Sequence, residues 1–223
     1  RRPPVRLTVR GTMDVWAVKE TFLDAFYTRH GTAVQDGWQI VDIGAGIGDF
    51  SIYAAYGHPR TVIYAYEPFP ESYKLLIKNL TLNAIDNVRT FQQAVWRRDA
   101  QLALDLSGGE PLQIASKEAA DLSDSDRQVI VAAVSLASVL ESQAFPKVDL
   151  LKMDCEGAEY AILLDAPHDV LHRIDRIIME YHDIDELNNH RALLSFLERQ
   201  GYRVSLHRNV VHADIGYLFA SRI

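Results

Sequence analysis

Short hydrophobic runs recur along the chain and alternate with segments whose apolar residues follow the spacing of a helix. The runs are mostly continuous, which is typical of strands that are buried on both faces of a sheet. They lie at residues 40–43, 61–66, 87–96, 148–154 and 176–182. The segments with helical spacing lie at residues 12–30, 50–56, 70–83 and 188–200. Strands that alternate with helices predict an α/β fold, in which a mostly parallel sheet carries helices on both faces.

Two parts of the chain depart from this alternation. Residues 202–208 and 216–221 are separated by a polar loop and predict a final antiparallel hairpin. Residues 97–140 contain a strand pattern at 128–134 and a short helix pattern at 135–140. We expect one domain over residues 1–223, in which residues 1–36 form an arm and a helix. Residues 97–140 are expected to be an insertion near the substrate side.

A glycine-rich turn follows the first predicted strand. Gly44, Gly46 and Gly48 come directly after Ile43, and a helical pattern begins near Asp49. Glycine permits positive φ angles and a close approach of the backbone to a ligand. The dinucleotide pattern G-x-G-x-x-G would place its last glycine where Asp49 stands, and a carboxylate is unfavourable beside a pyrophosphate. A ligand with a sulfonium and an ammonium group suits the turn better, and S-adenosylmethionine is such a ligand.

An acid at the end of the second predicted strand supports a nucleoside cofactor. Glu67 follows the glycine turn by about 20 residues, which is the position from which a carboxylate accepts hydrogen bonds from ribose hydroxyls. Phe69 is a candidate for stacking on adenine, and the end of the third strand should border the base. The predicted cofactor residues are Asp42, Gly44, Ala45, Gly46, Glu67, Pro68, Phe69, Ala94 and Asp154.

Composition narrows the classes of partner. The chain has 223 residues, a net charge of −7 and one cysteine. The acidic balance argues against a surface that follows nucleic-acid phosphates. A single cysteine excludes an internal disulfide and fits a reducing compartment, so we expect a cytoplasmic protein. No apolar run reaches the length of a membrane span, and no signal peptide is visible.

Several segments resemble the FkbM-type S-adenosylmethionine-dependent methyltransferases over roughly residues 12 to 221. The most specific is Leu151-Lys152-Met153-Asp154-Cys155-Glu156-Gly157-Ala158-Glu159. The others are residues 41–48, Tyr66-Glu67-Pro68 with Asn79 and Asn83 downstream, and Glu180-Tyr181-His182. One departure is Ala45-Gly46, where the family more often has Ala-Asn. The resemblance implies a Rossmann-like class I methyltransferase fold with seven strands. It also implies O-methylation of a hydroxyl on a sugar, glycan or secondary metabolite.

Transfer of a methyl group to a hydroxyl requires that the hydroxyl be activated as a nucleophile. A neutral hydroxyl is a poor nucleophile, and a general base or a metal ion must lower the cost of removing its proton. The catalytic candidates are Asp154, Glu180 and His182, at the ends of adjacent predicted strands. Asp154 and Glu180, together with Glu156 or His182, could hold Mg²⁺. Alternatively, His182 acts as the base with a carboxylate orienting it, and we prefer this metal-free version. Glu159 is expected to be a helix N-terminal acid and Cys155 a packing residue.

Other functions remain open at the level of sequence. Related folds methylate RNA, although the acidic charge weighs against that partner. The chain could also be a non-catalytic nucleoside-binding subunit, or, less in keeping with the turn, a dehydrogenase. The preferred acceptor is a small molecule or a glycan, and the sequence makes no prediction of the oligomeric state.

Overall fold

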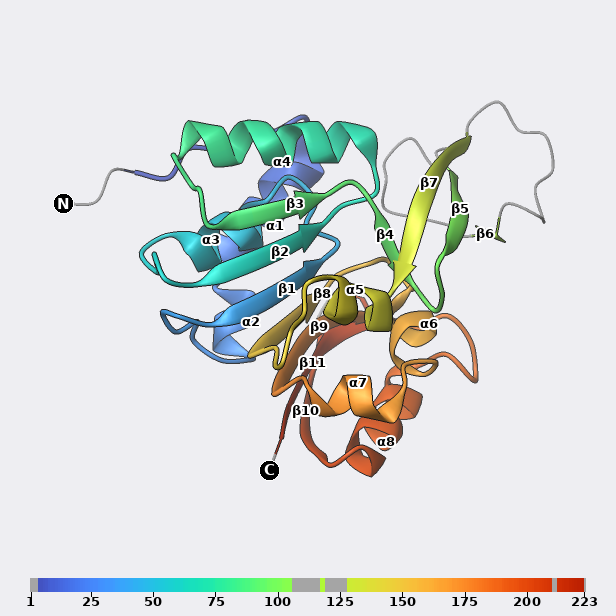
Figure 1. Cartoon of the computed structure of the whole chain (residues 1–223). Coiled ribbons are helices and arrows are strands. Elements are labelled where there is room, and N and C mark those ends of the chain that lie inside the picture. The colour runs from blue at the N-terminus through green and yellow to red at the C-terminus, as the bar shows by residue number, and fades with distance from the viewer. Residues whose placement is uncertain (1–3, 106–116, 119–127, 210–211, 223) are drawn as a thin grey trace.

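The computed structural model describes residues 4–105, 117–118, 128–209 and 212–222, and its centre is a sheet of seven strands (Figure 1). The strand order is β10-β11-β9-β8-β1-β2-β3. Pairing is parallel from β9 to β3, whereas β11 is antiparallel to both of its neighbours. This arrangement confirms the predicted mostly parallel sheet with an antiparallel hairpin at the end. The strands are β1 (Gln39–Ile43), β2 (Val62–Tyr66), β3 (Val88–Phe91), β8 (Leu150–Met153), β9 (Arg176–His182), β10 (Tyr202–Arg208) and β11 (Ile215–Arg222).

Helices cover both faces of this sheet because its strands present apolar side chains to both sides. On β1, Ile40 packs in a cluster with Phe50 and Ala54 of α3. Val41 and Ile43 pack in a second cluster with residues of the helices α5 to α8. The helices are α1 (Thr12–Phe22), α2 (Phe26–Arg29), α3 (Asp49–Ala55), α4 (Pro70–Leu82), α5 (Leu136–Ser142), α6 (Glu159–Leu163), α7 (His168–His172) and α8 (His190–Arg199).

The strand order places the functional edge of the sheet. β1 lies between β2 and β8. The chain adds β2 and β3 on one side of β1, and later adds β8 and the remaining strands on the other side. In open α/β sheets ligands bind beyond the carboxyl ends of the strands at such a switch point. The glycine turn, Glu67 and Asp154 follow β1, β2 and β8 and therefore meet at this edge.

A smaller sheet stands beside the main one, in green and yellow in Figure 1. The single strand predicted at residues 87–96 is interrupted at Gln92 and Gln93, and its second part leaves the main sheet to pair with β7. The predicted strand at 128–134 and the helix at 135–140 correspond to β7 and α5. The sheet has the order β4-β7-β5-β6, with β4 (Ala94–Trp96), β5 (Ala100–Asp105), β6 (Lys117–Glu118) and β7 (Gln128–Ser135).

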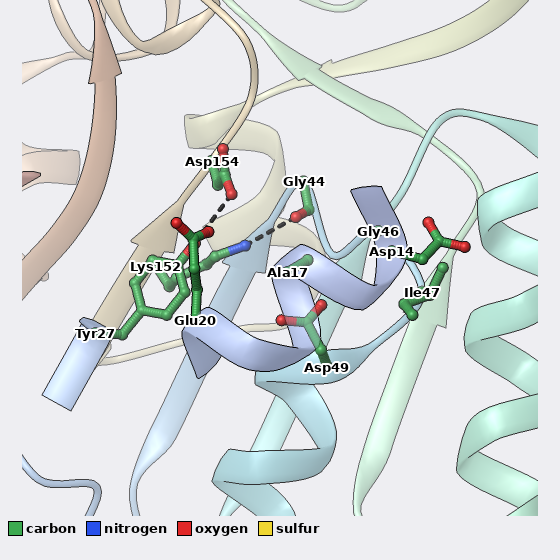
Figure 2. A pocket seen from close by; sticks show the side chains of 10 residues that line it. All are labelled: Asp14, Ala17, Glu20, Tyr27, Gly44, Gly46, Ile47, Asp49, Lys152 and Asp154. Atoms are coloured by element: carbon green, nitrogen blue, oxygen red, sulfur yellow. Dashed lines mark hydrogen bonds between the residues drawn. The ribbon is translucent and has the colours of Figure 1, made fainter. Parts of the chain in front are cut away.

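The N-terminal helix is shorter than predicted. The pattern at residues 12–30 is divided into α1 and α2, and Ala25 between them has a left-handed φ of 52°. Helical φ angles are negative, so a left-handed residue ends the first helix. The break lets α1 lie beside α3, where the Thr21 hydroxyl donates a hydrogen bond to Asp49. Helix α1 thereby comes to lie over the glycine turn, as Figure 2 shows.

Candidate active site

The glycine turn after β1 has the conformation that its sequence predicts. Gly44, Gly46 and Gly48 have φ angles of 72°, 54° and 89°. A Cβ atom at Gly44 would overlap the backbone carbonyl of Asp154, so no side chain fits there. The N–H groups of Gly44 and Ala45 both donate to the carbonyl of Tyr66 at 3.0 Å. The turn is therefore fixed against the ends of both neighbouring strands.

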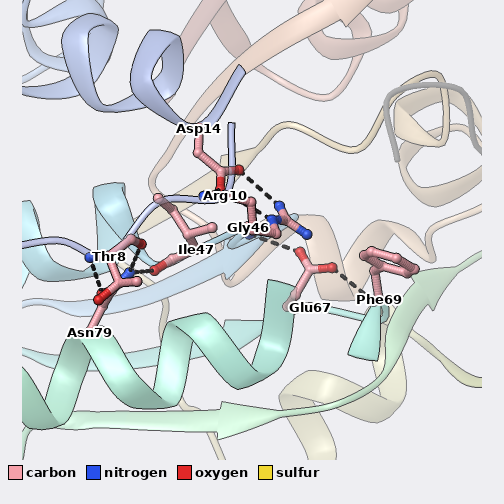
Figure 3. A network of polar contacts seen from close by, with 8 residues as sticks. All are labelled: Thr8, Arg10, Asp14, Gly46, Ile47, Glu67, Phe69 and Asn79. Atoms are coloured by element: carbon pink, nitrogen blue, oxygen red, sulfur yellow. Dashed lines mark hydrogen bonds and ion pairs between the residues drawn. The ribbon is translucent and has the colours of Figure 1, made fainter. Parts of the chain in front are cut away.

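Glu67 is the carboxylate that the turn holds most directly. It is buried, and its Oε2 accepts a hydrogen bond from the Gly46 N–H at 2.8 Å. Its Oε1 accepts one from the Phe69 N–H, also at 2.8 Å (Figure 3). Burial raises the pKa of Glu67 to about 7, although both backbone hydrogen bonds oppose that shift. Each oxygen keeps a lone pair for a further donor, as a ribose-binding carboxylate requires.

The other predicted cofactor residues fall into two groups. Some lie where the adenine base is expected, and Asp42 lies in the protein interior. Pro68 is buried beside Glu67, and Phe69 packs in one cluster with Ala94 of β4. The residues expected around an adenine therefore lie together, and their contact with the base stays a prediction. Asp42, by contrast, is fully buried and does not line the pocket. Its expected contact with the cofactor's amino group is replaced by contacts within the protein.

Asp42 pairs with a buried lysine that the sequence argument did not single out. The Lys152 Nζ lies 3.1 Å from Asp42 Oδ1 and donates to the carbonyl of Gly44 at 2.8 Å. The hydroxyl of Ser51 donates to Asp42 Oδ2 at 2.7 Å. Burial alone would lower the pKa of Lys152, but the charges of Asp42, Asp154 and Asp49 outweigh it and raise that pKa. The ion pair thus stabilises the glycine turn through the hydrogen bond from Lys152 to the carbonyl of Gly44.

A segment before α1 is held against α4 by two asparagines one helical turn apart. Asn79 accepts from the N–H of Thr8 at 2.7 Å, and its amide donates to the carbonyls of Thr8 and Ile47. Asn83 accepts from the N–H of Arg6 at 2.9 Å and donates to its carbonyl. We call residues 5–10 the N-terminal strap. The spacing of the two asparagines is the signal from which it could have been predicted.

The strap brings Arg10 to the proposed adenosine site (Figure 3). The guanidinium carbon lies 6.0 Å from the centre of the Phe69 ring, and Arg10 pairs with Asp14 at 2.8 Å. The pKa of Arg10 is raised chiefly by that hydrogen bond, with a contribution from the charge of Glu67. A guanidinium over an aromatic ring, beside a carboxylate, is a suitable boundary for a stacked base.

A pocket of about 100 Å³ lies between the glycine turn, α1 and the end of β8 (Figure 2). Asp14, Ala17 and Glu20 of α1 form one wall. Its volume is below the roughly 300 Å³ at which ligand pockets usually begin, so it is smaller than the space that a whole nucleoside cofactor occupies. The lining contains four acids and one lysine, a balance that suits a cationic ligand: Asp14, Ala17, Glu20, Tyr27, Gly44, Gly46, Ile47, Asp49, Lys152 and Asp154.

The three predicted catalytic residues lie together at the acidic end of this pocket. Asp154, Glu180 and His182 each present one ligand atom, and these atoms all lie within 4.8 Å of one another. Glu180 and His182 are two residues apart on β9, so their side chains share a face of the sheet. Glu156 is placed differently, because its Oε2 lies 3.4 Å from His182 Nε2. Of the two third ligands that the sequence left open, the group that gathers among the described residues contains His182 and not Glu156.

Each of these three residues also has an outer partner. The hydroxyl of Tyr27 donates to Asp154 Oδ2 at 2.9 Å, and that of Tyr217 donates to Glu180 Oε1 at 3.2 Å. His182 Nδ1 lies 3.3 Å from Oε1 of Glu159, which is fully buried. The two tyrosines were not predicted, whereas Glu159 does lie in the first turn of α6, as expected, and contacts His182 in addition. The tyrosines lie 127 and 37 residues from their partners in the sequence, where no local pattern links them.

The excess of carboxylates shifts the protonation of the cluster. Burial would lower the pKa of His182, but its hydrogen bond to Glu159 and the surrounding charges raise it to about 10. Burial, reinforced by the charge of Asp154, raises the pKa of Glu156 to about 8 and also raises that of Glu180. At neutral pH the bare site therefore keeps a proton on His182, which disfavours this residue as a ready base.

Comparison with known proteins places this geometry in a family. A family model described as the methyltransferase FkbM domain matches residues 42–204. The chain belongs to the FkbM methyltransferase family. The matched region of this methyltransferase contains the glycine turn, Glu67 and the Asp154–Glu180–His182 cluster, whereas the strap, α1 and Tyr217 lie outside it. A relative is the 31-O-demethyl-FK506 methyltransferase FkbM of Streptomyces tacrolimicus, with 27% identity over 75% of this chain and 74% of that protein.

Solved structures show the same fold for this FkbM methyltransferase. The FkbM methyltransferase of Methylobacillus flagellatus is 15% identical and has a TM-score of 0.58, covering 87% of this chain and 46% of that one. Fibrillarin of Aeropyrum pernix, solved with bound S-adenosylmethionine, is 15% identical with a TM-score of 0.50, over 84% and 67% of the two chains. These likenesses show the class I fold, and the family match shows that the chain is a methyltransferase. In the described part of the chain, every helix is too short or too polar to cross a bilayer.

Proposed function

We propose that this methyltransferase transfers the methyl group of S-adenosylmethionine to a hydroxyl of a small-molecule or glycan acceptor. The observation that carries the proposal is the pocket that joins Gly44 and Gly46 to Asp154. One end offers the backbone of a nucleoside-binding turn, and the other reaches the cluster of Asp154, Glu180 and His182. The name of the Streptomyces tacrolimicus relative specifies an O-demethyl compound, which supports oxygen as the accepting atom.

The cofactor is placed by the groups that surround the turn. Glu67 would accept hydrogen bonds from the ribose hydroxyls, while Pro68, Phe69 and Ala94 border the adenine. Gly44, Ala45 and Gly46 leave room for the backbone to approach the aminoacyl part of the cofactor. The acidic pocket favours the sulfonium and ammonium groups by charge.

Methyl transfer is a displacement at carbon. The bond between the methyl carbon and sulfur breaks, its electron pair stays on sulfur, and the carbon forms a bond to the acceptor oxygen. S-adenosylhomocysteine leaves, and the hydroxyl proton passes to a base. Glu180 is the proposed acceptor of that proton, because it lies beside Asp154 and His182 and its Oε2 is left free by the hydrogen bond that Tyr217 donates to Oε1. The protein contributes position and electrostatics, and the cofactor supplies the reactive methyl group.

The proposal is tested by following the methyl group. Labelled S-adenosylmethionine is incubated with a panel of hydroxylated small molecules and glycans, and products are identified by mass spectrometry. We expect an O-methyl ether and a turnover at least 100-fold lower for Glu180→Gln, the usual scale for removing a catalytic base. Glu186→Gln, which changes an exposed acid four residues after His182, should leave turnover unchanged. A methylated nitrogen or carbon, or no binding of S-adenosylhomocysteine by calorimetry, would refute the assignment.

A further inference from the structure

The cluster of Asp154, Glu180 and His182 has the geometry of a three-ligand cation site. Its three ligand atoms lie within 4.8 Å of one another, and all three side chains are partly buried. Two carboxylates and one neutral imidazole carry a charge of −2, which one divalent ion neutralises. Three protein ligands leave open positions, as catalytic metal sites do, and an acceptor oxygen can occupy one.

The outer contacts leave one atom of each residue available. Tyr27 occupies Oδ2 of Asp154, and Tyr217 occupies Oε1 of Glu180, so the opposite oxygen of each carboxylate remains. Glu159 takes the hydrogen of His182 Nδ1, which leaves Nε2 as the ligand nitrogen. Metal-binding histidines nearly always donate their other N–H to a carboxylate or carbonyl, and bound carboxylates are themselves hydrogen-bonded. Glu159 is fully buried and is an unusual residue to find at that position without such a role.

The local charge also calls for a cation. Glu156 and Glu159 both contact His182, at 3.4 Å and 3.3 Å, so two further carboxylates stand beside the cluster. Lys152 is already paired with Asp42. Like charges packed at this density in a partly buried site are costly unless a counter-charge is bound.

We propose that Asp154, Glu180 and His182 bind one divalent cation of the borderline class, such as Mn²⁺, in place of the Mg²⁺ that the sequence suggested. An imidazole ligand favours Mn²⁺ or Zn²⁺ over Mg²⁺, which prefers oxygen and keeps its waters. The role of this ion in holding the acceptor hydroxyl rests on the proposed function. There the ion would lower the pKa of the hydroxyl. Glu180 would then serve as a ligand, and Glu156, displaced from His182 Nε2, would receive the proton in its place.

The site is tested by metal binding rather than by turnover. Full-length protein is treated with a chelator, desalted and titrated with Mn²⁺ while electron paramagnetic resonance measures the free ion. We expect one Mn²⁺ per chain, a nitrogen coupling from His182, and little displacement by a large excess of Mg²⁺. His182→Gln should abolish the nitrogen coupling, and both it and Glu180→Gln should weaken binding at least 10-fold. Tyr217→Phe, which keeps all three ligands, should weaken binding about 10-fold, the lower end of the effect of outer partners.

Controls separate this proposal from the proposed function. Glu186→Gln should bind Mn²⁺ as the wild type does. Wild-type protein that takes up no Mn²⁺, or a His182→Gln variant that binds it equally well, would overturn the site. The same samples are titrated with S-adenosylhomocysteine: binding of the nucleoside without Mn²⁺ would preserve the proposed function and remove the metal. Mn²⁺ binding without the nucleoside would support the site and count against the proposed function.

Discussion

At the scale of single residues, Glu67 combines two properties that a ribose-binding acid needs. Two backbone N–H groups fix its oxygens, and burial raises its pKa to about 7. The first property orients the carboxylate before the ligand arrives. The second means that the carboxylate is only partly ionised at neutral pH, so its affinity for hydroxyl donors depends on pH.

Binding of S-adenosylhomocysteine should therefore strengthen as the pH rises. The pKa of Glu67 in the folded protein is about 7, so the ionised acceptor is lost below that pH. If the ribose requires the ionised form, affinity falls up to tenfold for each pH unit below 7, which corresponds to about 1.4 kcal/mol. Calorimetry between pH 5.5 and 8.5 measures this (a range of about three units about the pKa). Glu67→Gln should bind more weakly and lose most of the pH dependence, and an unchanged profile in that variant would exclude Glu67 as its source.

Lys152 should be a large contributor to stability, because its removal leaves Asp42 buried without a counter-charge. Breaking a buried ion pair from one side typically costs about 3–5 kcal/mol. We expect Lys152→Met to lower the free energy of unfolding in urea by that amount. Lys147→Met removes a half-exposed lysine that pairs with Asp175 at 2.6 Å, and should cost less than about 1 kcal/mol.

A double variant tests whether the unpaired charge of Asp42 causes the loss of stability in Lys152→Met. Replacing both partners, as in Asp42→Leu with Lys152→Met, removes the unpaired carboxylate and should recover part of the lost stability. Equal midpoints of urea unfolding for Lys152→Met and Lys147→Met would show that the buried ion pair contributes no more to stability than the half-exposed one.

The Asp42–Lys152 pair also shows what a sequence leaves out at this scale. Asp42 ends a strand beside a glycine turn, so a contact with the cofactor's amino group was a reasonable prediction. In the sheet, however, Asp42 of β1 stands opposite Lys152 of β8. That register depends on which strands are neighbours and is not encoded in either segment alone. Glu67 was predictable because its role depends on a spacing within one strand–turn–helix–strand segment.

At the scale of elements, the N-terminal strap completes the cofactor side of the molecule. It lies outside the region that matches the family model, yet Asn79 and Asn83 of the matched region hold its backbone. Helix α1 continues from the strap and forms one wall of the pocket. The strap therefore fixes the start of α1, and α1 limits the space in the pocket through Asp14, Ala17 and Glu20.

Removal of the Arg10 side chain should weaken binding of S-adenosylhomocysteine about fivefold. The guanidinium lies over Phe69 and beside Glu67, and a cation over an aromatic ring contributes about 1 kcal/mol. Calorimetry with Arg10→Ala measures the change. Arg6→Ala is the matched control, because Arg6 is held to Asn83 through its backbone and its exposed side chain can be removed. Equal affinities for the two variants would remove Arg10 from the adenosine site.

The elements themselves were largely predictable, and the two failures have physical causes. Periodicity located the strands of the main sheet and helices α3, α4, α5 and α8 to within a few residues. The hydrophobic spacing at residues 12–30 predicts one continuous helix, because the left-handed φ angle of Ala25 does not change the order of apolar and polar residues. The run at residues 87–96 is β-like on both sides of Gln92 and Gln93, so its transfer between two sheets is set by β7. The role of residues 97–140 as an insertion near the substrate stays a prediction.

At the scale of the whole molecule, the fold gathers acids that are scattered along the sequence. Glu67, Asp154 and Glu180 end or follow different strands, and parallel pairing brings those ends to one edge of the sheet. This convergence was predictable from the alternation of strands and helices. The outer partners Tyr27 and Tyr217 were not, because each comes from an element whose place beside the cluster depends on the complete topology.

The charge of the molecule gives a prediction about its partners. Sequence-independent binders of nucleic acid neutralise phosphates with lysine and arginine and reach dissociation constants of about 10⁻⁴–10⁻⁶ M at physiological salt. This chain has a net charge of −7, and the residues that line the pocket include four acids and one lysine. We therefore expect binding to bulk transfer RNA weaker than about 10⁻⁴ M even at low salt, measured by fluorescence anisotropy of labelled RNA. Tight binding that weakens steeply with added salt would instead indicate a basic surface and make RNA the acceptor to test first.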